Sequence, residues 1–385
     1  MRILYDGWPL SYQPNSPAAL HLLSLLAHHP ANFKALVALP AKPALLLPES
    51  VTAHIQATGA GDNSRLSWEQ RILPRLATLL KADLVHLSAS YPALLGKTNQ
   101  LISPTSSDTL SMSSFGFAAR PSLAARLRDA LGQGGLTRVS GVLWPDDLPT
   151  PGVPHNIFRL PRVTHPDLLS PSIFDMSSGE RPHLAEFSEL EMPETYILYH
   201  GPLSTLALRR LLGAWSWAAG SIGEYYPLLV AGVEASLHQK ITAMLTEFNL
   251  TDSVQLVPPL NLPSLFELYR GCSALFLPVP DSPWQGAIPL ALTCGKPIVA
   301  LETPESGALV GPAGYLLPDS NNMPDNRALG AALITVVVEE SVEEQLSQNA
   351  NQRATQWESH EQVQRFTHEL ASAYTLLGAQ QTRRQ

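Results

Sequence analysis

The sequence predicts an α/β protein built from two doubly wound, parallel-sheet domains. In both halves of the chain, short apolar runs of strand length alternate with amphipathic runs of helical length, and this alternation predicts parallel sheets covered by helices. The length of 385 residues fits two domains better than one. Prolines are dense between residues 145 and 193, which indicates an irregular connection between the two domains.

The first half begins with an apolar strand, followed by a loop rich in Gly, Pro and Asn at residues 7–17 and then by a helix. The expected strands of this half cover residues 1–5, 33–39, 84–87, 99–103, 138–143 and 156–160. The expected helices cover residues 18–27, 68–80 and 122–131.

The second half repeats the alternation more clearly and predicts a second doubly wound sheet. Its expected strands cover residues 196–199, 227–231, 254–256, 274–277 and 297–301, with a loop-to-strand segment at 308–317. Its expected helices cover residues 206–220, 236–248, 263–271, 285–294, 326–338, 342–357 and 360–377.

These elements suggest the domain boundaries. We expect an N-terminal domain over residues 1–170, a linker over 171–194 and a C-terminal domain over 195–356. The last helix, within residues 357–385, is expected to return to the N-terminal domain.

Composition excludes several classes of function. The formal net charge is −8 and no extended Lys/Arg cluster occurs, so a nucleic-acid-binding surface is not expected. Cys272 and Cys294 lie in apolar runs, which favours buried thiols in a reducing compartment. No signal peptide and no apolar run of transmembrane length is recognisable, so we expect a cytoplasmic protein without a transmembrane segment. The histidines lack the spacing of a metal site, and no metal or other cofactor is expected.

Several motifs follow one another in a recognisable order. The stretch LFLPVPDSPWQGAIPLALTCGKPIVALETPESGALVGPAGYLLPD contains Cys-Gly-Lys-Pro at residues 294–297 and Gly-Pro-Ala-Gly at 311–314. Upstream lie TYILYHGPL, LPSLFELYRGCSALFLPV, RLSWEQRILPRLATLLKADLVHLSASYPALL and FRLPRVTHP. In this order, the motifs resemble those of retaining glycosyltransferases with the GT-B fold (group 1, family 4-like). The resemblance implies two Rossmann-like domains that face each other across a cleft. The resemblance covers almost the whole chain.

The resemblance implies transfer of a sugar, of the hexosyltransferase type, from a nucleotide-sugar donor to a glycan, lipid or small-molecule acceptor. It assigns no catalytic residue, because the family's motif residues are replaced here. It implies these donor-side candidates: Gly201, Pro202, Ser282, Gln285, Gly286, Ala287 and Glu305. On the acceptor side it implies Gly7 and Trp8, which follow the first strand, and Asp108.

The chain departs from the family at the positions that carry the chemistry. The two motif glutamates correspond to Ser282 and Leu290, and the phosphate-binding Arg/Lys pair corresponds to Pro202 and the stretch at 205–206. Arg209 and Arg210 are the remaining phosphate candidates, although two arginines on a helix are more often solvated surface residues. Residues 285–287 fit either an anion-binding helix start or a tight turn.

The same departures leave a second hypothesis open. The family's His-Asp pair corresponds to residues 103–108, which contain Asp108 but no histidine, so general acid-base help from a histidine is not expected there. The alternative to an enzyme is therefore a catalytically inactive GT-B pseudoenzyme. Such a protein would act as a partner of an active homologue or as a ligand-binding subunit.

Overall fold

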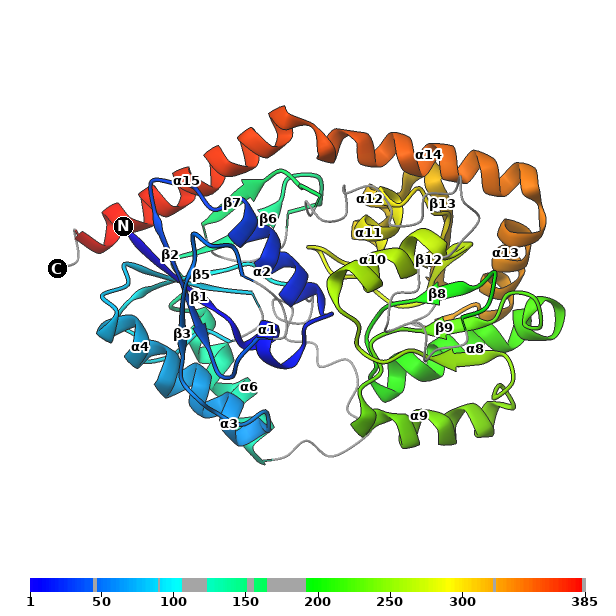
Figure 1. Cartoon of the computed structure of the whole chain (residues 1–385), viewed down its shortest axis with the longest axis horizontal. Coiled ribbons are helices and arrows are strands. Elements are labelled where there is room, and N and C mark those ends of the chain that lie inside the picture. The colour runs from blue at the N-terminus through cyan, green and yellow to red at the C-terminus, as the bar shows by residue number, and fades with distance from the viewer. Residues whose placement is uncertain are drawn as a thin grey trace. The chain divides into compact units, whose positions relative to one another are not determined.

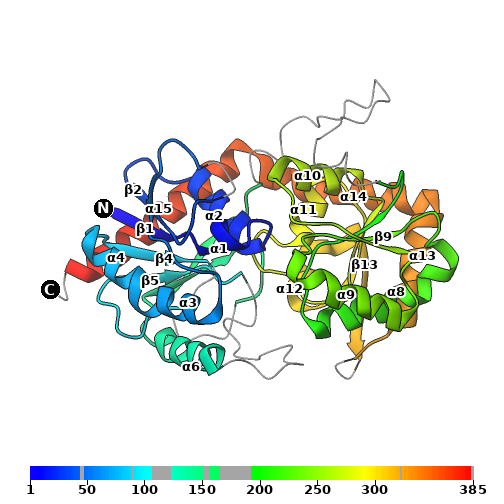
Figure 2. The same ribbon diagram turned by 60° about the horizontal axis from the view of Figure 1, so that its bottom comes forward.

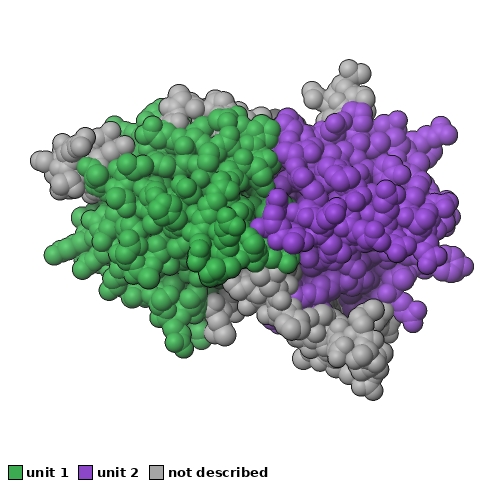
Figure 3. All heavy atoms as spheres, turned by 90° about the horizontal axis from the view of Figure 1, so that it is seen from above, with its two compact units in different colours: residues 1–165, 282–285, 357–385 green, residues 166–281, 286–356 purple. Residues whose placement is uncertain are grey.

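The computed structural model describes residues 1–43, 47–88, 91–105, 123–150, 156–164, 192–320 and 323–382. The chain divides into two compact units, which Figure 3 distinguishes by colour. Unit 1 comprises Met1–His165, Ser282–Gln285 and Trp357–Gln385, and unit 2 comprises Pro166–Asp281 and Gly286–Gln356.

Unit 1 is built on a seven-stranded, fully parallel sheet with the strand order β3-β2-β1-β4-β5-β6-β7. This order is that of a doubly wound sheet, in which successive crossovers run outward in both directions from the first strand. The strands are β1 (Arg2–Asp6), β2 (Lys34–Leu39), β3 (Thr52–Ile55), β4 (Leu84–Leu87), β5 (Asn99–Ile102), β6 (Gly141–Pro145) and β7 (Ile157–Leu160).

Helices cover both faces of this sheet (Figures 1 and 2). One face carries α3 (Asp62–Ser67), a π-helical turn (Trp68–Ile72), α4 (Leu73–Leu79) and α6 (Leu123–Leu136). The opposite face carries α2 (Pro17–Ala27) and the C-terminal helix α15 (His360–Thr382), while α1 (Trp8–Tyr12) follows β1 directly.

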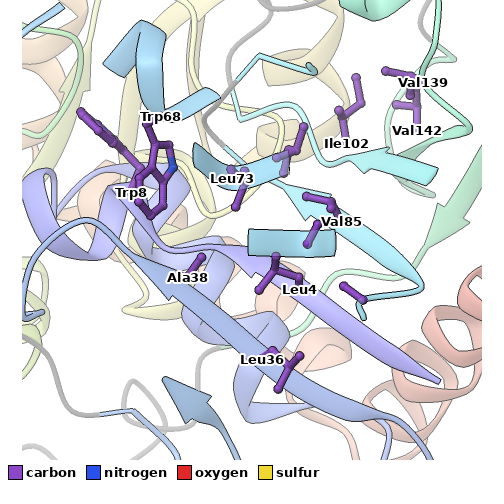
Figure 4. Close-up of a cluster of buried hydrophobic side chains, with 13 residues drawn as sticks. Leu4, Trp8, Leu36, Ala38, Trp68, Leu73, Val85, Ile102, Val139 and Val142 are labelled. Atoms are coloured by element: carbon purple, nitrogen blue, oxygen red, sulfur yellow. The ribbon is translucent and has the colours of Figure 1, made fainter. Parts of the chain in front are cut away.

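The core under α3 and α4 contains side chains from one face of the sheet (Figure 4). Leu4, Leu36 and Val85 come from neighbouring strands, and Trp8 and Trp68 pack over them. Because successive strand residues point to opposite faces, Tyr5 and His86 point the other way and meet α15, whose Tyr374 hydroxyl is hydrogen-bonded to both.

Unit 2 repeats the topology with the order β10-β9-β8-β11-β12-β13-β14, in which only β14 is antiparallel. The strands are β8 (Ile197–Tyr199), β9 (Leu228–Val230), β10 (Val254–Leu256), β11 (Ala274–Leu277), β12 (Ile298–Glu302), β13 (Gly314–Ser320) and β14 (Met323–Pro324). The helices are α8 (Thr205–Ile222), α9 (Ala235–Phe248), α10 (Leu262–Gly271), α11 (Ala287–Thr293), α12 (Pro304–Val310), α13 (Asn326–Val338) and α14 (Glu340–Glu358). Helices α8 and α9 cover the face of the sheet opposite to α10 and α11 (Figure 2).

The predicted α/β class with two doubly wound sheets is confirmed, and three local predictions are wrong. Residues 7–17 are not a loop throughout, because they contain α1 with a proline in its first turn, where a missing N–H costs nothing. The segment 308–317 begins inside α12, which a Thr303–Ser306 capping box starts. The predicted helix at 68–80 is α-helical only from Leu73 to Leu79, because residues 68–72 form the π-helical turn. Of the predicted linker, residues 171–191 lie outside the described part of the chain.

Candidate functional site

The carboxyl ends of β8 and β11 form the topological switch point of the unit 2 sheet. These strands are neighbours, and the crossovers that follow them lead to opposite sides of the sheet. Open α/β sheets bind ligands at such a point. The two loops concerned cover residues 200–204 and 278–286, and they contain five of the seven donor-side candidates, with a sixth, Ala287, at the first position of α11.

The first loop is tightly packed around Gly201. A Cβ atom on Gly201 would lie 2.9 Å from both the Leu277 and Tyr199 side chains, so only glycine fits without a shift. The Tyr199 hydroxyl donates to the Pro202 carbonyl at 2.6 Å. Ser204 then caps α8 by accepting from the Ala207 amide at 3.2 Å. The loop therefore presents the N-terminus of a long helix at the switch point.

His200, Tyr269 and Asp281 form a polar group beside this loop. His200 Nδ1 lies 2.7 Å from the Tyr269 hydroxyl. Burial raises the pKa of Tyr269 well above its usual value, and the charge of Asp281 raises it further. The phenol therefore stays protonated and holds the imidazole in place. Neither His200 nor Asp281 was a candidate from the sequence, because the family motifs direct attention to the residues after them.

The Asp281 carboxylate accepts hydrogen bonds from two backbone amides at the start of α11. Its Oδ1 accepts from the Ala287 amide at 3.0 Å and its Oδ2 accepts from the Ile288 amide at 2.8 Å. Gly286 makes this possible, because a Cβ there would lie 2.3 Å from Asp281 Oδ1. Of the two interpretations of residues 285–287, the structure therefore favours the tight turn, since the Ala287 amide already donates to an internal carboxylate.

The remaining donor-side candidates do not form one group. Ser282 and Gln285 belong to unit 1, where Gln285 Nε2 donates to Ser24 Oγ and to the Val163 carbonyl. Glu305 lies in the first turn of α12, at the carboxyl end of β12. Leu290, at the second motif-glutamate position, is buried within α11.

Arg209 is engaged in a surface ion pair. Its guanidinium donates to both carboxylate oxygens of Glu247, at 2.9 and 3.0 Å, and both side chains are about half exposed. The solvated interpretation of Arg209 therefore fits the structure better than phosphate binding. Arg210 lies beside it on α8 and is partly buried.

Lys240 is a cation that sequence reasoning missed. Its ammonium group donates to Thr205 Oγ1 at 2.7 Å, in the first turn of α8. It lies on the next helix, α9, so no spacing within a motif indicates it. An exposed ammonium beside a helix N-terminus adds to that terminus's affinity for anions.

The acceptor-side candidates of unit 1 are structural. Gly7 precedes α1, and a Cβ there would lie 2.5 Å from the Ala38 carbonyl oxygen. Trp8 is 1% exposed and packs against Trp68 and Tyr12 (Figure 4). The structure therefore explains both residues by packing, and their assignment to acceptor binding stays a prediction. Asp108 lies outside the described residues.

A histidine does lie beside Ser103, contrary to the expectation from the sequence. His86 Nε2 is 2.6 Å from Ser103 Oγ, and His86 Nδ1 is 2.9 Å from the Tyr374 hydroxyl. His86 comes from β4 and Ser103 follows the adjacent strand β5. Parallel pairing, not sequence proximity, brings the two together, and the signal was that both lie near the carboxyl ends of buried strands.

A hydrogen-bond network runs from His29 through Tyr5, Tyr374 and His86 to Ser103, and the donor of each of its bonds can be assigned. The Phe33 carbonyl can only accept, so His29 Nε2 donates to it at 3.1 Å, and neutral His29 accepts from the Tyr5 hydroxyl at 2.8 Å. Burial lowers the pKa of His29 and so favours this neutral form. Tyr5 then accepts from the Tyr374 hydroxyl at 2.8 Å.

The same reasoning fixes the other end of the network. Because Tyr374 donates to Tyr5, it accepts from the Nδ1–H group of His86, and His86 Nε2 accepts from the Ser103 hydroxyl. Burial lowers the pKa of His86 to about 3. The network therefore consists of neutral groups and connects α15 to β1 and β4.

Two further expectations concern cysteines and metals. Cys272 and Cys294 are free thiols, and burial raises the pKa of each to about 12. Within the described ranges, no group of three or more His, Cys, Asp or Glu side chains could hold a metal ion. In the same ranges, every helix is too short or too polar to span a lipid bilayer.

Comparison with known proteins identifies the fold. No protein-family model and no curated protein matches the sequence. Sucrose-phosphate synthase from Thermosynechococcus elongatus is similar in structure, with a TM-score of 0.67 and 16% identity over 98% of this chain and 99% of that chain. WaaG, a glycosyltransferase involved in lipopolysaccharide biosynthesis, gives a TM-score of 0.68 and 13% identity over 95% and 98% of the two chains.

HepE from Anabaena, solved with UDP and glucose, also has a TM-score of 0.68, with 16% identity over 97% of this chain and 99% of that chain. HepE has also been solved with UDP-glucose. This chain therefore has the GT-B fold of glycosyltransferases. At these identities the similarity establishes the fold and not the reaction.

Proposed function

We propose that this chain is a glycosyltransferase-type protein that binds a nucleotide sugar at the carboxyl edge of the unit 2 sheet. The observation that carries the proposal is the grouping of His200, the α8 N-terminus and Lys240 beside the switch point. Binding of UDP and UDP-glucose by HepE, which has the same fold, supports the choice of ligand.

The diphosphate is the part of the donor that these groups suit. The N-terminal turn of α8 carries a partial positive charge, and Lys240 adds a full charge next to Thr205. His200, held by Tyr269, directly follows β8 at the same edge of the sheet. Stabilisation of the leaving diphosphate by such groups requires no metal ion.

The acceptor side of the proposal is broader. A glycan, a lipid or a small molecule fits the fold equally well, and the two free thiols favour a reducing, cytoplasmic location. The acceptor candidates Gly7 and Trp8 do not support a particular choice, since both are part of the structural core.

One observation favours the second candidate, a GT-B pseudoenzyme that acts as a partner or ligand-binding subunit. The position of the first motif glutamate carries Ser282, the position of the second carries the buried Leu290, and Asp281 occupies two amides at the start of α11. A protein of this kind would bind a nucleotide without transferring sugar.

Calorimetric titration with UDP, GDP and ADP, with and without Mg²⁺, tests the proposal. We expect saturable binding of one nucleotide tighter than about 100 μM, or about 5.5 kcal/mol, and weaker binding by Lys240→Ala. Arg209→Ala is the matched control on the neighbouring helix. Absence of binding across the panel would refute a nucleotide site. Release of sugar from the corresponding nucleotide sugar then separates a transferase from a binding subunit.

A further inference from the structure

The outer strands of the two sheets differ in how they resist pairing with another chain. Within the described residues, each sheet ends in two strands with a neighbour on one side only, β3 and β7 in unit 1 and β10 and β14 in unit 2. Such edges leave backbone N–H and C=O groups open, and proteins commonly block them with Pro or charged side chains. β14 contains Pro324, β7 carries Arg159, and Pro258 closely follows β10. Three of the four edges therefore have a blocking residue.

The remaining edge, at β3, has none of these devices. Residues 51–61, which include β3, contain no Pro, Asp, Glu, Lys or Arg. Thr52, Ala53 and Ile55 are exposed, and the Ile55 side chain is 59% exposed although it is large and apolar. An exposed strand edge without charge or proline is a ready template for pairing with a further strand.

The hydrogen bonds between β3 and β2 show which backbone groups of β3 remain open. The two strands are parallel, with Ile55 beside Leu39, and the Gln56 amide donates to the Leu39 carbonyl at 2.9 Å. Alternate residues of a strand bond to the same neighbour. The N–H and C=O groups of Ala53, Ile55 and Ala57 therefore point away from β2, toward the open side of the sheet.

We infer that the open edge of β3 pairs with the same edge of a second copy of this chain. Antiparallel pairing about a two-fold axis at Ile55 places this residue opposite its own counterpart, and Ala53 opposite Ala57 of the second copy. Each of these pairs exchanges two N–H···O=C bonds, so the open groups of all three residues are satisfied.

The sequence of the edge suits a second copy in particular. In the stretch Ala-His-Ile-Gln-Ala at residues 53–57, two small alanines lie symmetrically about Ile55. A two-fold interface brings identical surfaces together, and like charges directly opposite each other across paired strands would be unfavourable. None of these five residues is Asp, Glu, Lys or Arg, so no such pair arises, and the two Ile55 side chains meet at the axis.

The size of this contact sets its strength. Two short strands bury less than the about 1,200 Å² of a standard stable interface, so the dimer forms and dissociates with protein concentration. It joins the sheets of two unit 1 copies into one continuous sheet. The contact lies in unit 1 and does not depend on nucleotide binding by unit 2.

Sedimentation velocity of the full chain over a range of concentrations tests this inference. The dimer fraction is expected to rise with concentration, with a dissociation constant of about 100 μM. Ile55→Lys places two ammonium groups opposite each other at the axis and is expected to weaken dimerisation at least about tenfold. Leu79→Lys makes the same change of charge at an exposed position of α4. It is the matched control and is expected to dimerise as the unaltered chain does.

Two results of this experiment would overturn the inference. One is a chain that stays monomeric up to about 1 mM, which would leave the edge to an extended segment of another protein. The other is an Ile55→Lys variant that dimerises as strongly as the unaltered chain.

Disulfide cross-linking tests the register of the two strands. Ile55→Cys brings two introduced thiols onto Cα atoms about 5.5 Å apart, within disulfide range, so oxidation with diamide is expected to link two chains. Ala53→Cys lies on the same open edge but faces Ala57 of the second copy, and it is expected to cross-link far less. The unaltered chain, with its free thiols Cys272 and Cys294, gives the background. Equal cross-linking of the two variants would overturn the proposed pairing and would leave the nucleotide site of unit 2 untouched.

Discussion

Asp281 Oδ2 accepts a hydrogen bond of 2.8 Å from the backbone amide of Ile288, which fixes the loop after β11 to the first turn of α11. Replacement of Asp281 by Ala removes this bond and the one from the Ala287 amide. We expect a loss of about 1 kcal/mol in the free energy of unfolding, the usual cost of losing a helix cap. Urea denaturation measures it. Asp252→Ala, in an exposed turn, serves as the control, and equal effects of the two substitutions would contradict the capping role.

Tyr374→Phe tests the neutral hydrogen-bond network of unit 1. The substitution removes the hydroxyl that connects Tyr5 to His86 and costs each of these buried groups one hydrogen bond, including the acceptor of the His86 Nδ1–H group. The expected loss is about 2 kcal/mol in the free energy of unfolding. The exposed Tyr225 provides a control, since Tyr225→Phe is expected to change stability little. A neutral Tyr374→Phe substitution would show that the network is not stabilising.

The network also predicts how stability depends on pH. Burial lowers the pKa of His86 from 6.5 to about 3 in the folded protein, so the unfolded chain binds a proton in this window and the folded chain does not. The stability from this group is therefore complete above about pH 6.5 and decreases as the pH falls toward 3, by up to about 1.4 kcal/mol per pH unit. The lowered pKa values of His21, His28 and His29 act in the same direction.

Urea denaturation between pH 4 and pH 8 checks this dependence. The slope of stability against pH is expected to be smaller in His86→Gln than in the unaltered chain. His238→Gln, on the exposed side of α9, is the control for loss of a histidine. An unchanged slope in His86→Gln would exclude His86 as a source of the dependence.

The two cations near the start of α8 are predicted to behave differently. Under the proposed function, Lys240→Ala weakens binding of the preferred nucleotide about tenfold, because the ammonium group lies beside the α8 N-terminus. Arg209→Ala leaves nucleotide affinity unchanged and costs less than about 1 kcal/mol of stability, as expected for an exposed ion pair. A larger effect of Arg209→Ala on nucleotide affinity would restore Arg209 as the phosphate ligand.

Substitution of Trp8 tests whether this residue belongs to the core or binds an acceptor. Trp8→Ala removes a fully buried indole that packs against Trp68, and a loss of about 3 to 5 kcal/mol in unfolding free energy is expected. Thermal and urea denaturation measure this loss, and Trp217→Ala, at a half-exposed position, should cost much less. A stable Trp8→Ala variant would return Trp8 to the set of candidate ligand contacts.

The sequence predicted strands well where a short apolar run is buried on both faces of the sheet. Strands β4 and β11 were predicted at the residues where they occur, because each is a short apolar run between turn residues and is buried on both faces. The turn at Gly7 was misread for the opposite reason: proline suggested a stiff loop, whereas Pro9 in the first turn of α1 is compatible with a helix.

The site was less predictable, because it depends on contacts between distant parts of the chain. Lys240 and Thr205 lie on successive helices, and His86 and Ser103 lie at the ends of neighbouring strands. No spacing within one motif encodes either pair. The use of the Ala287 and Ile288 amides by Asp281 depends on how one loop folds back on itself, which the family motif does not specify.

The return of α15 to unit 1 has a consequence for the order of events during synthesis. Tyr374 completes the bonding of Tyr5 and His86, although it leaves the ribosome after the whole of unit 2. At about 5 to 20 residues per second, the stretch between His165 and Trp357 takes about 10 to 40 seconds to make. Throughout that interval the nascent β1 and β4 lack their last helix. The first sheet to be translated is therefore the second to be finished.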